Sequence, residues 1–289
     1  MPSLNGGADA GRQWAQHQMA ELDASCERIR LPMGHHHMVW RRVGSGPPIA
    51  LLHGGHGSWL HWARVIPALS RHFTLWVPDM PGYGETTLTP AHGLDELLRW
   101  LAHGLDGLVG TTAPVSLLGF SFGGLVAAKL AVMRGHTDRL ALIGPAGHGG
   151  VRRARHALRP WRGLDPDANA DQWLETMRFN LAAHMLHNAS AVDALAIEIQ
   201  WQGCLHTRFH SKPFSRSSEL RVALGRFNGP ILELWGEHDV TGAPHLMCAE
   251  RPFVRRHHHR VTVENAGHWL MHEAPSETTH GLMNWLQST

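Results

Sequence analysis

The stretch Gly-Phe-Ser-Phe-Gly at residues 119–123 places a serine between two glycines, where an apolar segment gives way to a helical one. Residues 113–118 form a short, mostly apolar segment of strand length, and residues 124–133 have the composition of a buried helix. A serine in so sharp a turn needs a strained backbone, and the flanking glycines remove Cβ atoms that would collide there. This setting predicts that Ser121 is a nucleophile whose hydroxyl faces a cleft above the N-terminus of the helix.

The same stretch also fits a tight strand-to-helix turn in which Ser121 only caps the helix. The pattern G-x-S-x-G is by itself a weak signal in a chain that contains 31 glycines. Three further segments favour the nucleophile over the cap.

The first of these is a glycine-rich loop that follows the apolar residues 48–52. It reads His-Gly-Gly-His-Gly-Ser at residues 53–58, so its backbone N–H groups can face a cavity without side chains in the way. We therefore predict that the N–H groups of Gly55 and Phe122 hold the oxyanion of a tetrahedral intermediate. A flexible loop or an anion-binding nest is the alternative, but no Gly-Lys-Ser/Thr follows, and a Walker-type phosphate loop is unsupported.

The other two segments are apolar strands that run into polar loops carrying an acid and a base. Residues 230–235 lead to Asp239, and residues 261–263 lead to His268. The chain order serine, aspartate, histidine is one of the known orders of a serine nucleophile with its base and acid. We predict a triad of Ser121, Asp239 and His268, although Asp239 alone also suits a turn and His268 is one of 25 histidines.

Together these motifs resemble the α/β-hydrolase superfamily over nearly the whole chain, from about residue 27 to residue 286. Residues 79–84, Asp-Met-Pro-Gly-Tyr-Gly, are similar to the family's D-x-P-G-x-G turn. The resemblance implies an α/β-hydrolase fold: an eight-stranded, mostly parallel sheet flanked by helices, with a helical cap inserted after the sixth strand. It also implies that Asp79 is structural. Asp239 keeps the acid role because residues 145–147, after the expected sixth strand, contain no carboxylate.

The chain is expected to have three parts. Residues 1–26 form a helical or frayed N-terminal extension, residues 27–147 and 229–289 form the hydrolase core, and residues 148–228 form the helical cap. Glycine-rich stretches bound the cap, as the hinges of a lid would. Apolar residues repeat at helical spacing inside it, a pattern that more often reflects packing than binding.

Length and composition fit a globular enzyme. The chain has 289 residues, of which 43% are hydrophobic and 17% charged, and its net charge of +2 argues against a nucleic-acid partner. Three scattered cysteines, Cys26, Cys204 and Cys248, form no disulfide framework and favour a reducing cytoplasm. No apolar run reaches about 18 residues and no signal-peptide pattern opens the sequence, so we expect a cytoplasmic protein that does not bind membranes. The oligomeric state, a homo-oligomer included, stays open.

Two histidine runs invite a metal-binding interpretation that their spacing does not support. Residues 35–37 fall in an expected strand, where alternate side chains point to opposite faces, and residues 257–259 are expected in a solvated loop. Neither run has a spaced fourth ligand. The arginines at positions 152, 153, 155, 159 and 162 are interpreted as a solvated face. We predict no metal and no cofactor.

The favoured function is a carboxylesterase-like serine hydrolase that cleaves a small carboxylic ester, thioester or lactone through an acyl-enzyme. In this mechanism His268 removes the proton of Ser121, and Asp239 orients the imidazole. A serine at position 121 argues against the dehalogenase and epoxide-hydrolase branches of the superfamily, which use an aspartate there. The alternative of another class is a non-catalytic small-molecule-binding protein on the same fold, which would not need all three residues.

A C–C bond hydrolase acting on a ring-fission diketo acid is the second enzymatic hypothesis. Residues 267–269 and 197–201 resemble segments of such hydrolases from aromatic meta-cleavage pathways. Those enzymes carry a cap arginine and an asparagine where this chain has Gln200 and Phe120, so a substrate carboxylate would lose its bidentate partner unless Arg208 replaces it. The acyl and leaving groups stay open. The residues expected to contact substrate are His56, Gln200, Trp201, Arg208 and Trp269.

Overall fold

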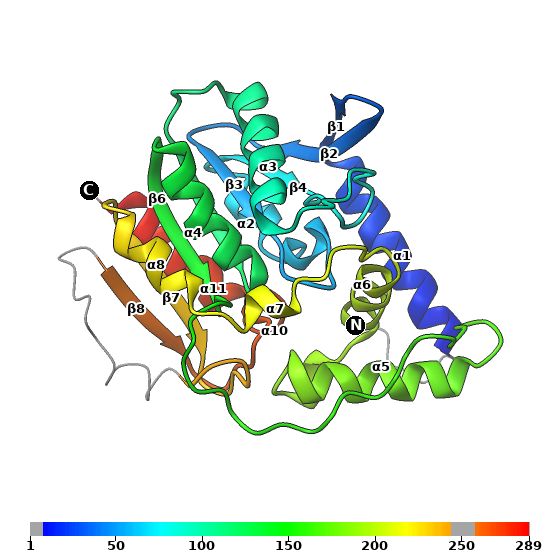
Figure 1. Cartoon of the computed structure of the whole chain (residues 1–289). Coiled ribbons are helices and arrows are strands. Elements are labelled where there is room, and N and C mark those ends of the chain that lie inside the picture. The colour runs from blue at the N-terminus through cyan, green and yellow to red at the C-terminus, as the bar shows by residue number, and fades with distance from the viewer. Residues whose placement is uncertain (1–7, 244–257, 289) are drawn as a thin grey trace.

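The computed structural model describes residues 8–243 and 258–288. Its strands form one eight-stranded sheet in the order β1-β2-β4-β3-β5-β6-β7-β8. The β1–β2 and β2–β4 pairs are antiparallel, and every later neighbour pairs in parallel. The predicted eight-stranded, mostly parallel fold is therefore confirmed (Figure 1). The strands are β1 (Glu27–Met33), β2 (His36–Val43), β3 (Pro48–Leu52), β4 (Thr74–Pro78), β5 (Val115–Phe120), β6 (Thr137–Ile143), β7 (Ile231–Gly236) and β8 (His258–Val263).

Helices cover both faces of the sheet and extend beyond it (Figure 1). They are α1 (Ala8–Ala24), the 3-10 turn η1 (Trp59–Trp62), α2 (Ile66–Leu69), α3 (Leu94–Val109), α4 (Phe122–Arg134), α5 (Ala170–His184), the 3-10 turn η2 (Ala189–Ala191), α6 (Ala194–Leu205), α7 (Lys212–Ser215), α8 (Glu219–Arg226), α10 (Leu270–Glu273) and α11 (Pro275–Gln287).

Alternate side chains of each central strand enter two different apolar cores. In β3, Ile49 and Leu51 pack into a core that includes residues of α2 and α11, while Ala50 and Leu52 pack into a core with α3, α4 and α8. Successive strand residues point to opposite faces, and both faces of this sheet are covered. This double burial explains why the central strands appear in the sequence as unbroken apolar runs.

The segment between β6 and β7 does not behave as one unit. Its last long helix, α8, packs on α4, and Leu220 and Ala223 join the core on that face of the sheet. Its earlier helices α5 and α6 pack against each other and against α1, away from the sheet (Figure 1). Both parts of the predicted cap reach an apolar core: residues of α5 and α6 belong to the cluster that contains Ile49 and Leu51, and α8 belongs to the cluster on the opposite face of the sheet.

The N-terminal helix α1 contacts a buried acid of α6. Glu198 is fully buried, and its Oε1 accepts hydrogen bonds from Gln16 Nε2 at 3.0 Å and from Gln202 Nε2 at 2.9 Å. Arg12 Nε lies 3.5 Å from the other oxygen, Oε2. The extension that lacked any functional signal in the sequence is thus packed along the predicted cap.

The expectation of a solvated loop at residues 257–259 was wrong for His258 and His259, which begin β8. His258 Nε2 lies 2.8 Å from Glu233 Oε1, and Arg260 Nε donates to Glu233 Oε2 at 2.9 Å. Burial alone would raise the pKa of the Glu233 carboxyl, but His258, Arg260 and Trp235 lower that pKa to about 2. The strand extends further back than expected because this buried carboxylate holds its first residues. His257 and Cys248 lie outside the described residues.

The described residues offer neither a metal-binding cluster nor a membrane-spanning helix. No cluster of three or more His, Cys, Asp and Glu side chains in residues 8–243 and 258–288 could hold a metal ion. Among the same residues, no helix combines the length and the apolar character needed to cross a bilayer.

We predict that Glu233→Gln lowers the free energy of unfolding at pH 7 by about 3 kcal/mol, since it removes the anion that compensates Arg260 and His258. The folded-state pKa of about 2 lies below the ordinary value of 4.5. The carboxylate's contribution is therefore complete above about pH 4.5 and is lost as the pH falls from there toward 2. Urea denaturation between pH 7 and pH 3 should show a steeper loss for the wild type than for the variant. Parallel pH dependences would contradict the assignment.

Candidate active site

Ser121 occupies a strained turn between β5 and α4. Its φ of 53° and ψ of −117° lie in a region that non-glycine residues rarely adopt. The backbone on both sides holds it there: Ser121 N–H donates to Ile143 O at 2.9 Å, and Ser121 O accepts from Ala146 N–H at 2.8 Å. The hydroxyl is thereby fixed at the carboxyl edge of the sheet.

Two glycines allow this turn to approach its neighbours closely. A Cβ at Gly123 would collide with the carbonyl oxygens of Leu52 and His53 at the end of β3, and one at Gly119 would collide with the carbonyl of Gly123. All the colliding atoms belong to the backbone, so no side-chain rotation could relieve the contact. Both positions require glycine because of space and not because of φ.

The structure brings the three residues of the predicted triad into one hydrogen-bonded chain. His268 Nε2 lies 2.9 Å from Ser121 Oγ, and His268 Nδ1 lies 2.8 Å from Asp239 Oδ2. Their loops follow β5, β7 and β8, parallel strands whose carboxyl ends share one edge of the sheet. Asp239 and His268 are buried, so the hydrogen bond between them is shielded from water.

Thr241 is a partner of Asp239 that the sequence prediction missed. Its backbone N–H and its hydroxyl donate to Asp239 Oδ1 at 2.7 and 2.8 Å. Burial alone would raise the pKa of Asp239, but the His268 imidazole and the hydrogen bonds from His268 and Thr241 lower it. The carboxylate is therefore charged when it faces the imidazole. A threonine two residues after an aspartate is a common turn pattern, and this spacing could have indicated it.

The glycine-rich loop after β3 lies directly beside the serine turn. Gly55 sits near the first residue of α4, since a Cβ there would lie 3.8 Å from the Cβ of Phe122. The preceding amide, Gly54 N–H, donates to His61 Nδ1 at 3.2 Å, so it is already used inside the protein. Gly55 and Phe122, the two predicted oxyanion donors, are thus brought together, while Gly54 is engaged elsewhere.

His53 fixes the start of this loop. Its Nε2 accepts from Met80 N–H at 3.0 Å, and its Nδ1 lies 2.8 Å from the carbonyl oxygen of Gly54. Burial lowers the pKa of His53, so the ring is neutral and can donate at Nδ1 while it accepts at Nε2. The ring acts as a bridge between the β3 and β4 loops.

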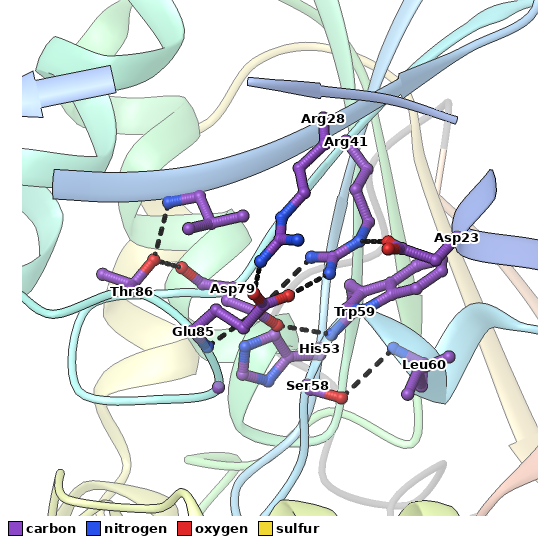
Figure 2. Close-up of polar contacts among 12 residues, drawn as sticks. Asp23, Arg28, Arg41, His53, Ser58, Trp59, Leu60, Asp79, Glu85 and Thr86 are labelled. Atoms are coloured by element: carbon purple, nitrogen blue, oxygen red, sulfur yellow. Dashed lines mark hydrogen bonds and ion pairs between the residues drawn. The ribbon is translucent and has the colours of Figure 1, made fainter. Parts of the chain in front are cut away.

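Asp79 stabilises the end of the same loop (Figure 2). Its Oδ1 accepts from Trp59 N–H at 3.0 Å, and its Oδ2 accepts from Glu85 N–H at 3.1 Å and from Arg41 Nη1 at 3.3 Å. The buried Arg41 also donates to Asp23 at 2.5 Å, pairs with Glu85, and stacks 4.1 Å from the Trp59 ring. All these contacts give Asp79 a structural setting, separate from the His268 imidazole.

Two of the predicted substrate contacts lie in the β6–β7 segment but are turned to other partners. The Trp201 ring is buried against the rings of Trp161 and Trp173, at centroid distances of 6.0 and 5.9 Å. The guanidinium of Arg208 donates to the carbonyl oxygens of Gly84 and Thr86. The geometry therefore does not bring Arg208 to Ser121 as a free cation.

The remaining predicted contacts lie around the glycine-rich loop. Gln200 Nε2 donates to the carbonyl oxygen of His56 at 3.2 Å, and His56 itself has a positive φ of 52°. The buried indole of Trp269 donates to the carbonyl oxygen of His61 at 2.9 Å. These residues connect the loop to α6 and to the His268 segment.

His184, at the end of α5, was not predicted from the sequence. Its ring centroid lies 5.8 Å from that of His268. Burial is the main reason why the pKa of His184 falls to about 3, so this neighbour is neutral and does not repel a charged His268. No local pattern marks it, because its position depends on how α5 packs against the rest of the fold.

The sequence matches a known protein family over most of its length. The model of the alpha/beta hydrolase family matches residues 49–280, which is most of the chain. The chain belongs to the alpha/beta hydrolase family. Its relatives are named as enzymes, and this chain is accordingly a hydrolase of that family.

Curated relatives of this hydrolase include methyl ester esterases and a 2-hydroxy-6-oxo-2,4-heptadienoate hydrolase. A pimeloyl-[acyl-carrier protein] methyl ester esterase of Vibrio campbellii is 28% identical over 215 residues, covering 69% of this chain and 79% of the relative. A 2-hydroxy-6-oxo-2,4-heptadienoate hydrolase of Pseudomonas putida is 38% identical over 112 residues, covering 36% of this chain and 40% of the relative.

Solved structures share the fold of this hydrolase at low sequence identity. A bacterial membrane phospholipase A has a TM-score of 0.73 at 22% identity, with 96% of this chain and 91% of that chain covered. Naproxen esterase from Bacillus subtilis has a TM-score of 0.72 at 18% identity, with 99% and 100% covered. At such identities these similarities show the fold alone.

We predict that Gly123→Ala lowers the activity of this hydrolase by about 100-fold, because the methyl group would push the serine turn away from the β3 carbonyls. Gly107→Ala is the matched control, since a Cβ at this position in α3 has nothing within 4 Å. That control should keep full activity and gain about 0.5–1 kcal/mol of stability. Initial rates and thermal unfolding of both variants test this, and wild-type activity in Gly123→Ala would disprove the close-approach argument.

Proposed function

We propose that this protein is a serine hydrolase that cleaves a small carboxylic ester, thioester or lactone through an acyl-enzyme. The observation that carries the proposal is the hydrogen-bonded chain from Ser121 through His268 to Asp239, with the serine held in a strained turn. The methyl ester esterases among the relatives support an ester as the substrate class. Residues 148–228 are proposed as the cap over this site.

In the proposed reaction, His268 Nε2 takes the proton of Ser121 as its oxygen attacks the carbonyl carbon. Asp239 holds the imidazole at Nδ1 and stabilises its cation, and its lowered pKa keeps it charged for this role. The N–H groups of Gly55 and Phe122 receive the oxyanion, and each such donor contributes roughly 2.7–4 kcal/mol. His268 then protonates the leaving group, and water repeats the sequence on the acyl-enzyme.

Hydrolysis of a C–C bond in a ring-fission diketo acid is the second candidate. The relative from Pseudomonas putida favours it, although the match spans 40% of that protein. The apolar ring of Phe120 beside His268, at a centroid distance of 4.9 Å, and the engaged guanidinium of Arg208 argue for the ester. A diketo acid would need a cation for its carboxylate, and Arg208 already serves two backbone carbonyls.

We predict that a fluorophosphonate labels the wild-type protein and that Ser121→Ala abolishes both labelling and nearly all ester turnover, without loss of the folded state. His268→Ala should lower ester turnover more than Asp239→Asn does, because the first change removes the base and the second removes only the group that orients it. Mass spectrometry of the labelled peptide and circular dichroism of the variants provide the measurements. Near-wild-type turnover in Ser121→Ala would refute the assignment, and a folded protein that never reacts with the probe would favour a binding protein.

Two substrates of different charge separate the two enzymatic candidates. The wild type should turn over a neutral p-nitrophenyl ester and leave a ring-fission diketo acid unchanged. Arg208→Ala should change kcat/KM of the ester little, because no anion is left unpaired. If the wild type instead prefers the acid and Arg208→Ala removes that preference, at a cost of about 2–5 kcal/mol, the C–C hydrolase becomes the better assignment.

A further inference from the structure

Residues 185–188, between α5 and η2, lie directly against the loop that carries His268. Trp269 N–H donates to the carbonyl oxygen of Met185 at 2.7 Å. Gly267 faces the same segment, and a Cβ on it would lie 2.8 Å from His187 N and 3.1 Å from Leu186 C. The residues on either side of His268 are thus both in contact with the β6–β7 segment.

One carboxylate, that of Glu273 at the end of α10, joins the two segments. Its Oε2 accepts from Gly267 N–H at 2.7 Å, and its Oε1 accepts from His187 N–H at 2.9 Å and from Asn188 N–H at 2.5 Å. The side-chain Nδ2 of Asn188 also donates to Oε1, at 2.9 Å. Hydrogen bonds to a charged acceptor are roughly twice as strong as neutral ones, and this carboxylate collects several of them.

The same segment also contacts the turn that carries Asp239. The His187 ring stacks on the His238 ring at a centroid distance of 3.6 Å and an interplanar angle of 16°. Just before the segment, the His184 ring lies 5.8 Å from that of His268. Residues 184–188 therefore touch the loops of both the proposed acid and the proposed base.

We propose that Glu273 is a positioning residue for His268 and that it acts by fastening residues 187–188 to Gly267. The carboxylate does not contact Ser121. It fixes the backbone that precedes His268, and the orientation of that backbone sets the direction of Nε2 toward the serine hydroxyl. This inference rests on the proposed function, because it assigns a role relative to the proposed base.

Further contacts hold the β6–β7 segment against the His268 segment. Arg64 donates to the carbonyl oxygen of His272 at 2.9 Å and pairs with Asp193, the N-cap residue of α6. His272 Nε2 lies 3.2 Å from Asp193 Oδ1. The edge from Met185 to Asp193 is thus held on the His268 segment at several points.

The test compares Glu273→Ala, Glu273→Gln and the control Glu277→Ala, an exposed acid in the first turn of α11. The measurements are kcat and KM for p-nitrophenyl acetate, the rate of fluorophosphonate labelling of Ser121, and the melting temperature. Glu273→Ala should lower kcat and the labelling rate by about 10- to 100-fold at unchanged KM. Glu273→Gln keeps an acceptor oxygen and should recover most of that loss, while Glu277→Ala should behave as wild type.

A double-mutant cycle tests whether Glu273 acts on His268 through its contact with residues 187–188. Asn188→Ala should lower kcat less than Glu273→Ala does, and the two effects should not be additive, because both changes act on one contact. A labelling rate in Glu273→Ala equal to that of the wild type would overturn the inference, as would a loss that only follows the unfolded fraction at the assay temperature. Failure of the proposed function is distinguishable, since then the wild type itself would not be labelled at Ser121.

Discussion

The close approach of the serine turn to the end of β3 is the constraint on which the rest of the site depends. Gly123 lies against the carbonyl oxygens of Leu52 and His53, where no Cβ fits. This contact brings the first turn of α4 beside the glycine-rich loop, so that Phe122 and Gly55 lie near each other. The parallel register of β5, β6, β7 and β8 then sets the acid and base loops at the same edge.

A second feature is the neutral state of three buried histidines in and beside the site. Burial lowers the pKa values of His53, His61 and His184, the last to about 3. Neutral rings can accept and donate hydrogen bonds without opposing a positive charge nearby. None of these three rings therefore competes as a cation for the negative charge of Asp239. That charge can stabilise a positive charge on His268.

The sequence predicted the elements of the sheet better than it predicted the contacts between loops. The apolar runs and the G-x-S-x-G turn led to the correct strands because parallel strands buried on both faces leave an unbroken apolar signal. β5 nevertheless ends at Phe120 and not at residue 118, since the buried strand continues up to the serine itself. Ser121, Asp239 and His268 each follow such a strand, and this local signal was sufficient to choose them; their roles stay predictions.

Glu273 and His184 could not be found from local sequence, whereas the spacing of Thr241 from Asp239 is a turn pattern. Glu273 accepts hydrogen bonds from residues 187–188, which lie 85 or more positions earlier in the chain. A local sequence pattern cannot indicate a contact over that separation. Trp201 and Arg208 show the reverse case. Their residue types suit a binding site. In the structure, however, Trp201 packs in an aromatic cluster and Arg208 donates to two backbone carbonyls. Residue type alone does not distinguish a binding side chain from one that stabilises the fold.

The position of α1 has a consequence for the order in which this chain is completed during synthesis. This helix is synthesised before the strands, and Asp23 finds its partner Arg41 soon afterwards. The contact of Gln16 with Glu198 must wait for a residue that lies 182 positions later in the chain. Until then the apolar face of α1, including the fully buried Ala15, has no α6 to cover it. Helix α1 is therefore made long before its partner α6, and a nascent protein exposes this face until α6 has been synthesised.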